Sequence, residues 1–144
     1  MGRYASAERR TKETDIRIEI DLDGDGTGKI DTGIGFFDHM MDGFARHGLF
    51  NLGITCRGDL SVDCHHSIED IGIVLGETIA RALGDKKGIS RYGHCLLPMD
   101  ETLILCAVDL SGRCTLNWDV RCNTEKVGDF DVECVKEFWL GFAR

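Results

Sequence analysis

The sequence has a single proline in 144 residues and no long apolar stretch. Its longest uninterrupted apolar run is 103–108, which is far shorter than the roughly 20 residues of a membrane-spanning helix. Residues 1–15 are polar and contain no apolar core of the kind found in signal peptides. We therefore expect no secretory signal and no membrane partner. One proline against 18 glycines indicates regular elements joined by tight turns.

Basic residues are too few for a nucleic-acid-binding surface. The chain has 17 lysines and arginines against 25 aspartates and glutamates, so its formal net charge is −8. Non-specific binding of nucleic acid requires a basic surface, and we therefore expect no nucleic-acid partner. A few well-placed arginines are still enough to hold a small anionic substrate.

The seven cysteines form no recognisable metal or disulfide framework. They include no C-x-x-C pair, and their spacings do not match a zinc ribbon. An odd number of thiols in a chain that is 42% apolar and 29% charged predicts a folded cytoplasmic domain. We expect its cysteines to be reduced and mostly buried.

Apolar spacing predicts several strands and three helices in mixed order. Apolar residues at every second position indicate strands, and apolar residues at intervals of three and four positions indicate helices. Gly48 and Gly84 are expected to end the first two helices, and Asp63 to cap the start of the second. The expected helices are 36–48, 63–83 and 131–144, and the expected strands are 17–22, 52–56, 60–62, 101–108 and 114–120.

An internal repeat is visible at two offsets. Residues 19–24 resemble 107–112, 88 positions later, and residues 39–46 resemble 137–144, 98 positions later. Both matches keep the order strand, turn, helix, which predicts a duplicated fold. We expect a first half-domain over residues 9–88 and the beginning of a second over 89–144.

The second half is expected to be incomplete. After residue 46 the first copy continues through two strands and a second helix, whereas no such continuation follows the matching position in the second copy. The second sheet is therefore expected to be unfinished. Without that continuation, we also expect Phe138, Trp139 and Phe142 to be poorly covered.

The segment 63–70 carries the strongest chemical signal. On a helix, His65 and Glu69 are four residues apart and His66 and Glu69 are three apart, so all three are surface neighbours. Adjacent histidines point about 100° apart, so they would reach different metals or two sides of a cluster. Two imidazoles and a carboxylate suit Mn, Fe, Co, Ni or Zn, with the carboxylate favouring Mn or Fe. The alternative is a polar helix start with capping histidines.

Two further histidines lie on the first expected helix. His39 sits among Phe36, Phe37, Met40 and Met41 and is either a metal ligand or a core histidine. His47 comes one residue before the expected helix end, where an imidazole can also simply favour the C-terminal dipole.

The segment 21–27 imitates the beginning of a calcium-binding EF-hand loop. The match fails at the eighth position, which is Gly28, and at the twelfth, which is Thr32 where a bidentate glutamate belongs. Its flanks also have the alternation of strands rather than helices. We therefore expect no calcium site here. The same glycines are not a nucleotide fingerprint, because no helix opens after them.

Arg91 and Arg113 are candidates for phosphate recognition. Both lie at turns between strand-like segments, where a guanidinium can bind an anion with two donors. The neighbouring Lys86 and Lys87 add positive charge. The alternative is that both arginines are ordinary solvated surface residues.

Taken together, six ordered motifs resemble the imidazoleglycerol-phosphate dehydratase family of histidine biosynthesis, from about residue 9 to the end. The resemblance implies a duplicated α+β fold of the ribosomal protein S5 domain 2-like kind and a homo-oligomeric cage of 24 subunits. It also implies two Mn²⁺ ions per active site, at subunit interfaces. The motifs are GFFDHM (35–40), DxHHxxED (63–70), ALGDK (82–86), GIxRYG (88–93), PMDE (98–101) and DLSGR (109–113).

The resemblance also assigns roles to residues. The reaction it implies is loss of water from imidazole glycerol phosphate to give imidazole acetol phosphate, with a carboxylate handling the proton. Glu13 and Glu69 match catalytic positions, and His47 lies in a substrate-contacting stretch. Arg91 and Arg113 match the residues that hold the substrate phosphate. The positions that match metal ligands, which also contact the substrate, are His39, His65, His66 and Glu69.

Two departures from the family pattern bear on activity. The sequence has only one His-His-x-x-Glu motif, and the position equivalent to His39 in the second half is Glu137. Four ligands cannot fill two roughly six-coordinate manganese sites, so we expect this chain alone to be weakly active or inactive. The alternative is a non-catalytic metal-binding or assembly protein that keeps the same fold.

Overall fold

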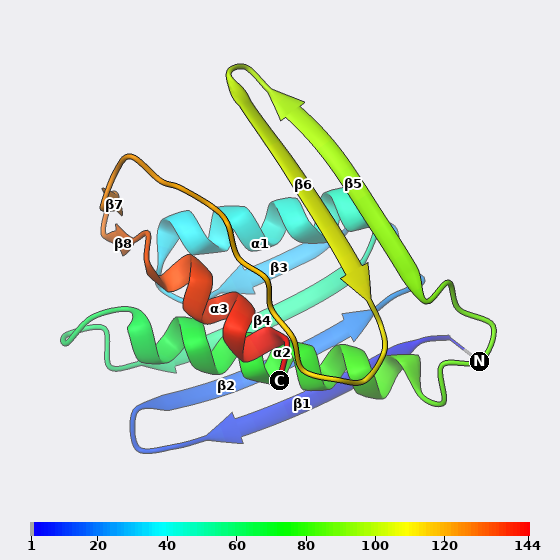
Figure 1. Cartoon of the computed structure of the whole chain (residues 1–144). Helices are drawn as coiled ribbons and strands as arrows, with labels where there is room; N and C mark the ends of the chain where they lie inside the picture. Colours follow the sequence, from blue (N-terminus) through cyan, green and yellow to red (C-terminus); the bar gives the residue numbers. More distant parts are fainter. Residues whose placement is uncertain (1) are drawn as a thin grey trace.

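The computed structural model describes residues 2–144 and contains one four-stranded sheet, two short ladders and three helices (Figure 1). The main sheet has the strand order β1-β2-β4-β3, in which only β3 and β4 run parallel. The elements are β1 (Tyr4–Arg10), β2 (Thr14–Asp21), β3 (Gly28–Asp31), α1 (Gly35–Gly48), β4 (Asn51–Gly58), α2 (His65–Leu83), β5 (Tyr92–Met99), β6 (Thr102–Asp109), β7 (Lys126–Val127), β8 (Phe130–Asp131) and α3 (Cys134–Phe142).

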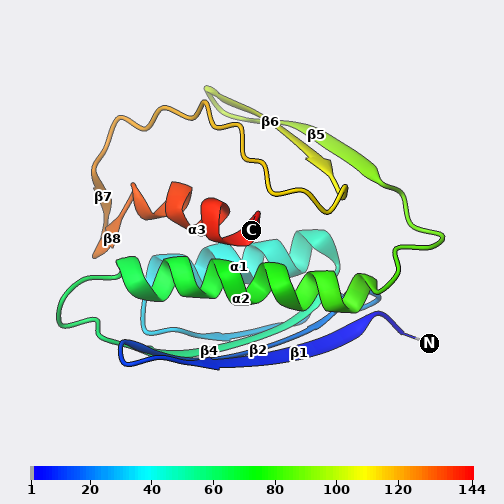
Figure 2. The same ribbon diagram turned by 60° about the horizontal axis from the view of Figure 1, so that its bottom comes forward.

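One face of the main sheet builds the core. In β2 every second side chain is buried, which follows from the two-residue period of a strand with one face against helices. β4 alternates in the same way. Helices α1 and α2 cover this face side by side (Figure 2). The resulting architecture is α+β, as the sequence predicts. Its strand-borne core residues are Ile16, Ile18, Ile20, Leu52, Ile54 and Cys56.

The first two helices match their prediction closely. α1 buries Phe37, Met41 and Ala45, which are four residues apart and therefore share one face. α2 ends at Leu83, with Gly84 as its C-cap. The end of α1 differs by one residue from the expectation, because Leu49 rather than Gly48 takes the left-handed conformation, with φ of 57°.

Helix α3 packs on α2 through glycines. A Cβ on Gly72 would lie 2.3 Å from the carbonyl oxygen of Phe138, and one on Gly76 would lie 2.3 Å from that of Phe142. The missing side chains let the two backbones approach closely. Phe138 is only 4% exposed, and Trp139 and Phe142 are partly buried against the core. The expectation of poorly covered aromatics is therefore wrong, because α2 provides their cover.

The hairpin β5–β6 stands apart from this core (Figure 1). Its eight paired positions run from Tyr92–Asp109 to Met99–Thr102, and every residue in both strands is exposed. Leu96, Leu103 and Leu105 are 60–69% exposed. Within residues 2–144 this sheet has only two strands.

Two expected strands are absent among the residues that the structure describes, and five observed strands were not predicted. Residues 60–62 form a turn, in which the backbone N–H of Val62 donates to the carbonyl of Asp59. Residues 114–120 alternate but have no neighbouring strand to pair with, and isolated strands are unstable. The two long unpredicted strands, β1 and β5, lack clean alternation, and β1 is a charged edge strand. The other three, β3, β7 and β8, have only two to four residues each.

The cysteines are all free, as expected, but most are not buried. Cys56, Cys64 and Cys134 are buried, whereas the other four are exposed. Two of the exposed thiols belong to the β5–β6 hairpin. They are exposed although they lie on strands, because nothing in the described part of the chain covers either face of this hairpin. No helix among residues 2–144 has the length and apolar content needed to cross a membrane.

Candidate metal and substrate site

The first turn of α2 carries the three strongest candidate ligands. The helix begins at His65, and the carboxylate of Asp63 accepts a hydrogen bond from the backbone N–H of His65 at 2.8 Å. The N-cap is Cys64 rather than the expected Asp63, although Asp63 still satisfies a free N–H at the helix start. The local sequence thus sets where the helix begins, and so the position from which the two histidine side chains project.

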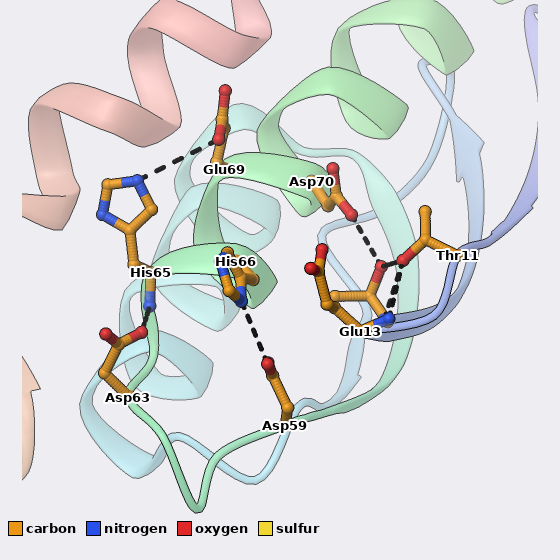
Figure 3. A network of polar contacts seen from close by, with 9 residues as sticks. Thr11, Glu13, Asp59, Asp63, His65, His66, Glu69 and Asp70 are labelled. Carbon is orange, nitrogen blue, oxygen red and sulfur yellow. Dashed lines mark hydrogen bonds and ion pairs between the residues drawn. The ribbon is translucent and has the colours of Figure 1, made fainter.

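His65, His66 and Glu69 are neighbours on that turn (Figure 3). Nε2 of His65 lies 4.0 Å from Oε2 of Glu69. The two imidazole rings have centroids 6.3 Å apart and planes 88° apart, so they diverge as their sequence positions predict. All three side chains are partly exposed, which leaves them accessible to a ligand.

Asp59 orients the imidazole of His66. Its Oδ2 lies 3.0 Å from Nδ1 of His66, and this hydrogen bond raises the pKa of the imidazole. The contact leaves Nε2 of His66 without a partner among residues 2–144 and available as a donor atom. A carboxylate on the far nitrogen is the usual support of a metal-binding histidine. Asp59 lies between the expected strands 52–56 and 60–62, and nothing in the sequence spacing links it to His66.

Arg144 contacts the other side of Glu69. Its Nη2 lies 3.1 Å from Oε1 of Glu69, while Oε2 of Glu69 faces His65. Both carboxylate oxygens therefore have a neighbour of positive or ionisable character. The packing of α3 on α2 brings Arg144 to this place, and no local pattern in the sequence points to the contact.

Glu13 lies on the short turn between β1 and β2, close to the start of α2 (Figure 3). The side chain is exposed, and its charge contributes to the raised pKa of His66. The backbone N–H of Glu13 donates to Oγ1 of Thr11 at 3.1 Å. A carboxylate that could act as acid or base thus stands on the His66 side of the helix start.

His39 and His47 lie elsewhere, on α1, and both are exposed. No group of three histidine, cysteine, aspartate or glutamate side chains in residues 2–144 gathers closely enough to hold a metal ion. One copy of the chain therefore carries these donors on α1 and α2 but does not assemble a metal site by itself, whether from the three α2 residues alone or together with His39.

The two arginines expected to bind phosphate lie at the end of β6. Arg91 is paired with Asp109, with Nε 2.7 Å from Oδ1, and this guanidinium lowers the pKa of Asp109. Arg113 lines a cleft of about 460 Å³ together with Asp109 and Ser111. The Arg113 cation beside the Ser111 hydroxyl suits an anionic group, and Arg91 can join it once it releases Asp109.

These arginines are far from the histidines within one copy. Nζ of Lys86, which follows α2, donates to the carbonyl of Leu110 at 3.1 Å and holds the β6 end near the C-terminus of α2. The histidines occupy the N-terminus of the same 19-residue helix. A helix of that length spans about 28 Å, so the two candidate subsites lie at opposite ends of α2.

Comparison with known proteins gives a consistent result. A family profile described as imidazoleglycerol-phosphate dehydratase matches residues 32–144. The dehydratase of Jannaschia sp. is 55% identical over 141 residues, covering 98% of this chain and 72% of the relative. That of Lachnoclostridium phytofermentans is 58% identical over 143 residues, covering 99% of this chain and 73% of the relative.

Solved structures agree with the fold. The imidazoleglycerol-phosphate dehydratase of Staphylococcus aureus superposes with a TM-score of 0.85 at 38% identity, covering 97% of this chain and 77% of that one. The enzyme of Pyrococcus furiosus, solved in complex with (S)-C348, has a TM-score of 0.77 at 39% identity and covers 95% and 72%. The chain thus spans about three quarters of the relatives it matches.

Proposed function

The chain belongs to the imidazoleglycerol-phosphate dehydratase family, and from this we propose how its residues serve the family reaction in histidine biosynthesis. The substrate is imidazole glycerol phosphate, and loss of water gives imidazole acetol phosphate. The observation that carries the proposal is the set of His65, His66 and Glu69 on one helical turn, with Asp59 orienting His66.

The fold is proposed to be a duplicated half-domain of the ribosomal protein S5 domain 2-like kind. β2 and β6 are each eight residues long and begin at Thr14 and Thr102, 88 positions apart. β1 and β5 begin at Tyr4 and Tyr92, again 88 apart. This is the offset seen in the sequence repeat, and it supports a duplication into the half-domains proposed at 9–88 and 89–144, with the first extended to include the whole of β1.

His65, His66 and Glu69 are proposed to supply donors to the two Mn²⁺ ions of the family site, with the diverging imidazoles reaching different ions and other copies completing each site. Two imidazoles and a carboxylate are a suitable donor set for this ion, and the Asp59 contact leaves Nε2 of His66 free to bind it. When bound, the metal would supply positive charge next to the substrate imidazole. His39 is proposed to come from a second copy, because it stands apart from the others within one chain.

The remaining roles fall to acidic and basic side chains. Glu13 is proposed to move the substrate proton, because its exposed carboxylate stands beside His66. Glu69 assists as a ligand carboxylate at the same turn, and His47 contacts the substrate from another face. Arg91 and Arg113 are proposed to hold the phosphate.

This division of roles requires an assembly of several copies. The histidines and the arginines lie at opposite ends of α2, about 28 Å apart along the helix. So small a substrate cannot span that length. A complete pocket therefore combines the histidine turn of one copy with the arginines of another, in a homo-oligomer for which the family cage of 24 subunits is the proposed form.

A titration of Mn²⁺ by calorimetry tests the metal assignment. We expect binding by the purified chain that His66→Gln weakens at least about tenfold, since each imidazole ligand is a large part of the affinity. His94→Gln is the matched control, because His94 is an exposed histidine on β5. Equal weakening by both variants, or by neither, would overturn the assignment.

A turnover assay is the second test, and it distinguishes a weakly active dehydratase from a non-catalytic metal-binding or assembly protein. The one His-His-x-x-Glu motif supplies too few donors for two manganese sites, so the chain is expected to convert imidazole glycerol phosphate far more slowly than a relative of full family length. Metal binding without any turnover would favour the non-catalytic metal-binding or assembly protein. Near-normal turnover would contradict the expectation of low activity.

A further inference from the structure

A chain of hydrogen bonds joins α2 to the turn that carries Glu13 (Figure 3). Oγ1 of Thr14 donates to Oδ2 of Asp70 at 2.6 Å. Oγ1 of Thr11 lies 3.0 Å from Oγ1 of Thr14. The same Thr11 oxygen accepts the backbone N–H groups of Glu13, at 3.1 Å, and of Thr14, at 2.9 Å. The turn is thus tied to the helix through two hydroxyl groups.

The connection is sheltered from water at its centre. Thr14 is only 3% exposed, and the side chain of Asp70 is 14% exposed. The second oxygen of Asp70 lies 3.2 Å from Nη2 of Arg9, at the end of β1. Hydrogen bonds to a charged group are stronger than neutral ones, and more so away from solvent. Asp70 therefore holds both sides of the β1–β2 turn.

The place of Asp70 in the sequence of α2 gives the contact its significance. Asp70 directly follows Glu69 and lies four residues after His66, so it belongs to the same turns as the candidate ligands. The carboxylate of Glu13 itself accepts no hydrogen bond and forms no ion pair within residues 2–144. Its position is set by its backbone, and its backbone is held by Thr11.

We propose that Asp70, Thr14 and Thr11 are positioning residues that hold Glu13 at a fixed place beside His66 and Glu69. This inference rests on the proposed role of Glu13 in proton movement. It adds a cause for that role, because an exposed carboxylate on a hairpin turn would otherwise sample many positions. A proton-transferring group needs a defined geometry with respect to its substrate.

The variant Thr14→Val removes the central hydroxyl and keeps the shape of a buried side chain. We expect amide hydrogen exchange at Glu13 to become about tenfold faster, because its acceptor Thr11 loses the link to Asp70. We also expect the relaxation enhancement that bound Mn²⁺ causes at the Glu13 amide to fall at least twofold. Thr14→Ser keeps the hydroxyl and should restore both values.

The control is Thr27→Val. Oγ1 of Thr27 donates to a carboxylate oxygen of Asp25 at 2.6 Å in the turn after β2, so the same kind of bond is lost far from Glu13. This variant should leave the Glu13 amide unchanged. If Thr14→Val does not fold, Thr11→Val tests the same series of hydrogen bonds, because it removes the hydroxyl group next to Glu13.

The two arms separate failure of this inference from failure of the metal proposal. Hydrogen exchange needs no metal, so unchanged exchange at Glu13 in Thr14→Val would overturn the positioning role directly. Absence of any Mn²⁺ effect at the His66 amide of the unaltered chain would instead overturn the proposed metal site. Equal changes at Glu13 in Thr14→Val and Thr14→Ser would also contradict the role of the hydroxyl.

Discussion

The guanidinium of Arg144 lies 3.1 Å from the carboxylate of Glu69, which joins the end of α3 to the candidate metal site on α2. A cation in this place competes with a metal ion for the same oxygen. Both side chains are partly exposed, so the pair is worth at most about 1 kcal/mol. The competition is therefore modest but measurable.

Replacing Arg144 by glutamine should strengthen Mn²⁺ binding about two- to fivefold, because Glu69 loses its competing partner. Calorimetric titration at constant pH measures the change. Arg46→Gln serves as control, since Arg46 forms a similar surface pair with Asp42 on α1. Unchanged or weaker Mn²⁺ binding by Arg144→Gln would contradict the competition.

Replacing Asp59 by asparagine should lower the pKa of the His66 imidazole, because the charged hydrogen-bond partner that raises it is gone. Since the folded-state pKa is raised, the pair stabilises the fold at low pH, and this contribution disappears as the pH rises through that pKa. Histidine NMR across pH 5 to 8 follows the titration. A pKa that stays the same in Asp59→Asn would show that Asp59 does not control His66.

Replacing Gly72 by alanine should destabilise the protein by about 1–3 kcal/mol, as overpacking of a well-packed contact does. The added Cβ would meet the carbonyl oxygen of Phe138, and backbone cannot move aside as a flexible side chain can. Gly43→Ala on α1 is the matched control, because nothing lies within 4 Å of its Cβ. That change should stabilise the helix by about 0.5–1 kcal/mol. Chemical unfolding that shows the same sign for both variants would contradict the close approach of α2 and α3.

Replacing Arg3 by glutamine should reduce stability at neutral pH and have a smaller effect in acid. The guanidinium of Arg3 lowers the pKa of Asp23 to about 2 through a hydrogen bond. A lowered carboxyl pKa stabilises the fold above the unfolded value of about 3.9, and this contribution is lost as the pH falls toward 2. Thermal unfolding at pH 7 and pH 2.5 compares the two chains. A difference that grows in acid would contradict this pairing.

The sequence was sufficient for elements whose pattern is local. The helical spacing of Phe37 and Met41 predicted α1, and the alternation over residues 17–22 predicted the C-terminal five residues of β2. It failed where structure depends on partners that are distant in sequence. Residues 114–120 alternate between apolar and polar side chains but have no neighbouring strand, and the exposed hairpin left two of the four exposed cysteines uncovered.

The residues of the candidate site also divide into those that a local pattern predicts and those that the fold brings in from elsewhere in the sequence. His65, His66 and Glu69 follow from spacing on a helix, because the helix itself brings them together. Asp59 and Arg144 reach the site through a turn and through helix packing, which no local pattern encodes. The separation of His39 from these ligands also emerges only in three dimensions.

Pulsed electron paramagnetic resonance of Mn²⁺ bound to the chain, with histidines labelled with ¹⁵N, tests the metal assignment most directly. We expect hyperfine coupling from imidazole nitrogen that decreases in His65→Gln and in His66→Gln and persists in His94→Gln. Mn²⁺ that shows coupling only to water protons, or coupling that neither α2 histidine affects, would contradict the assignment of this turn as the metal site.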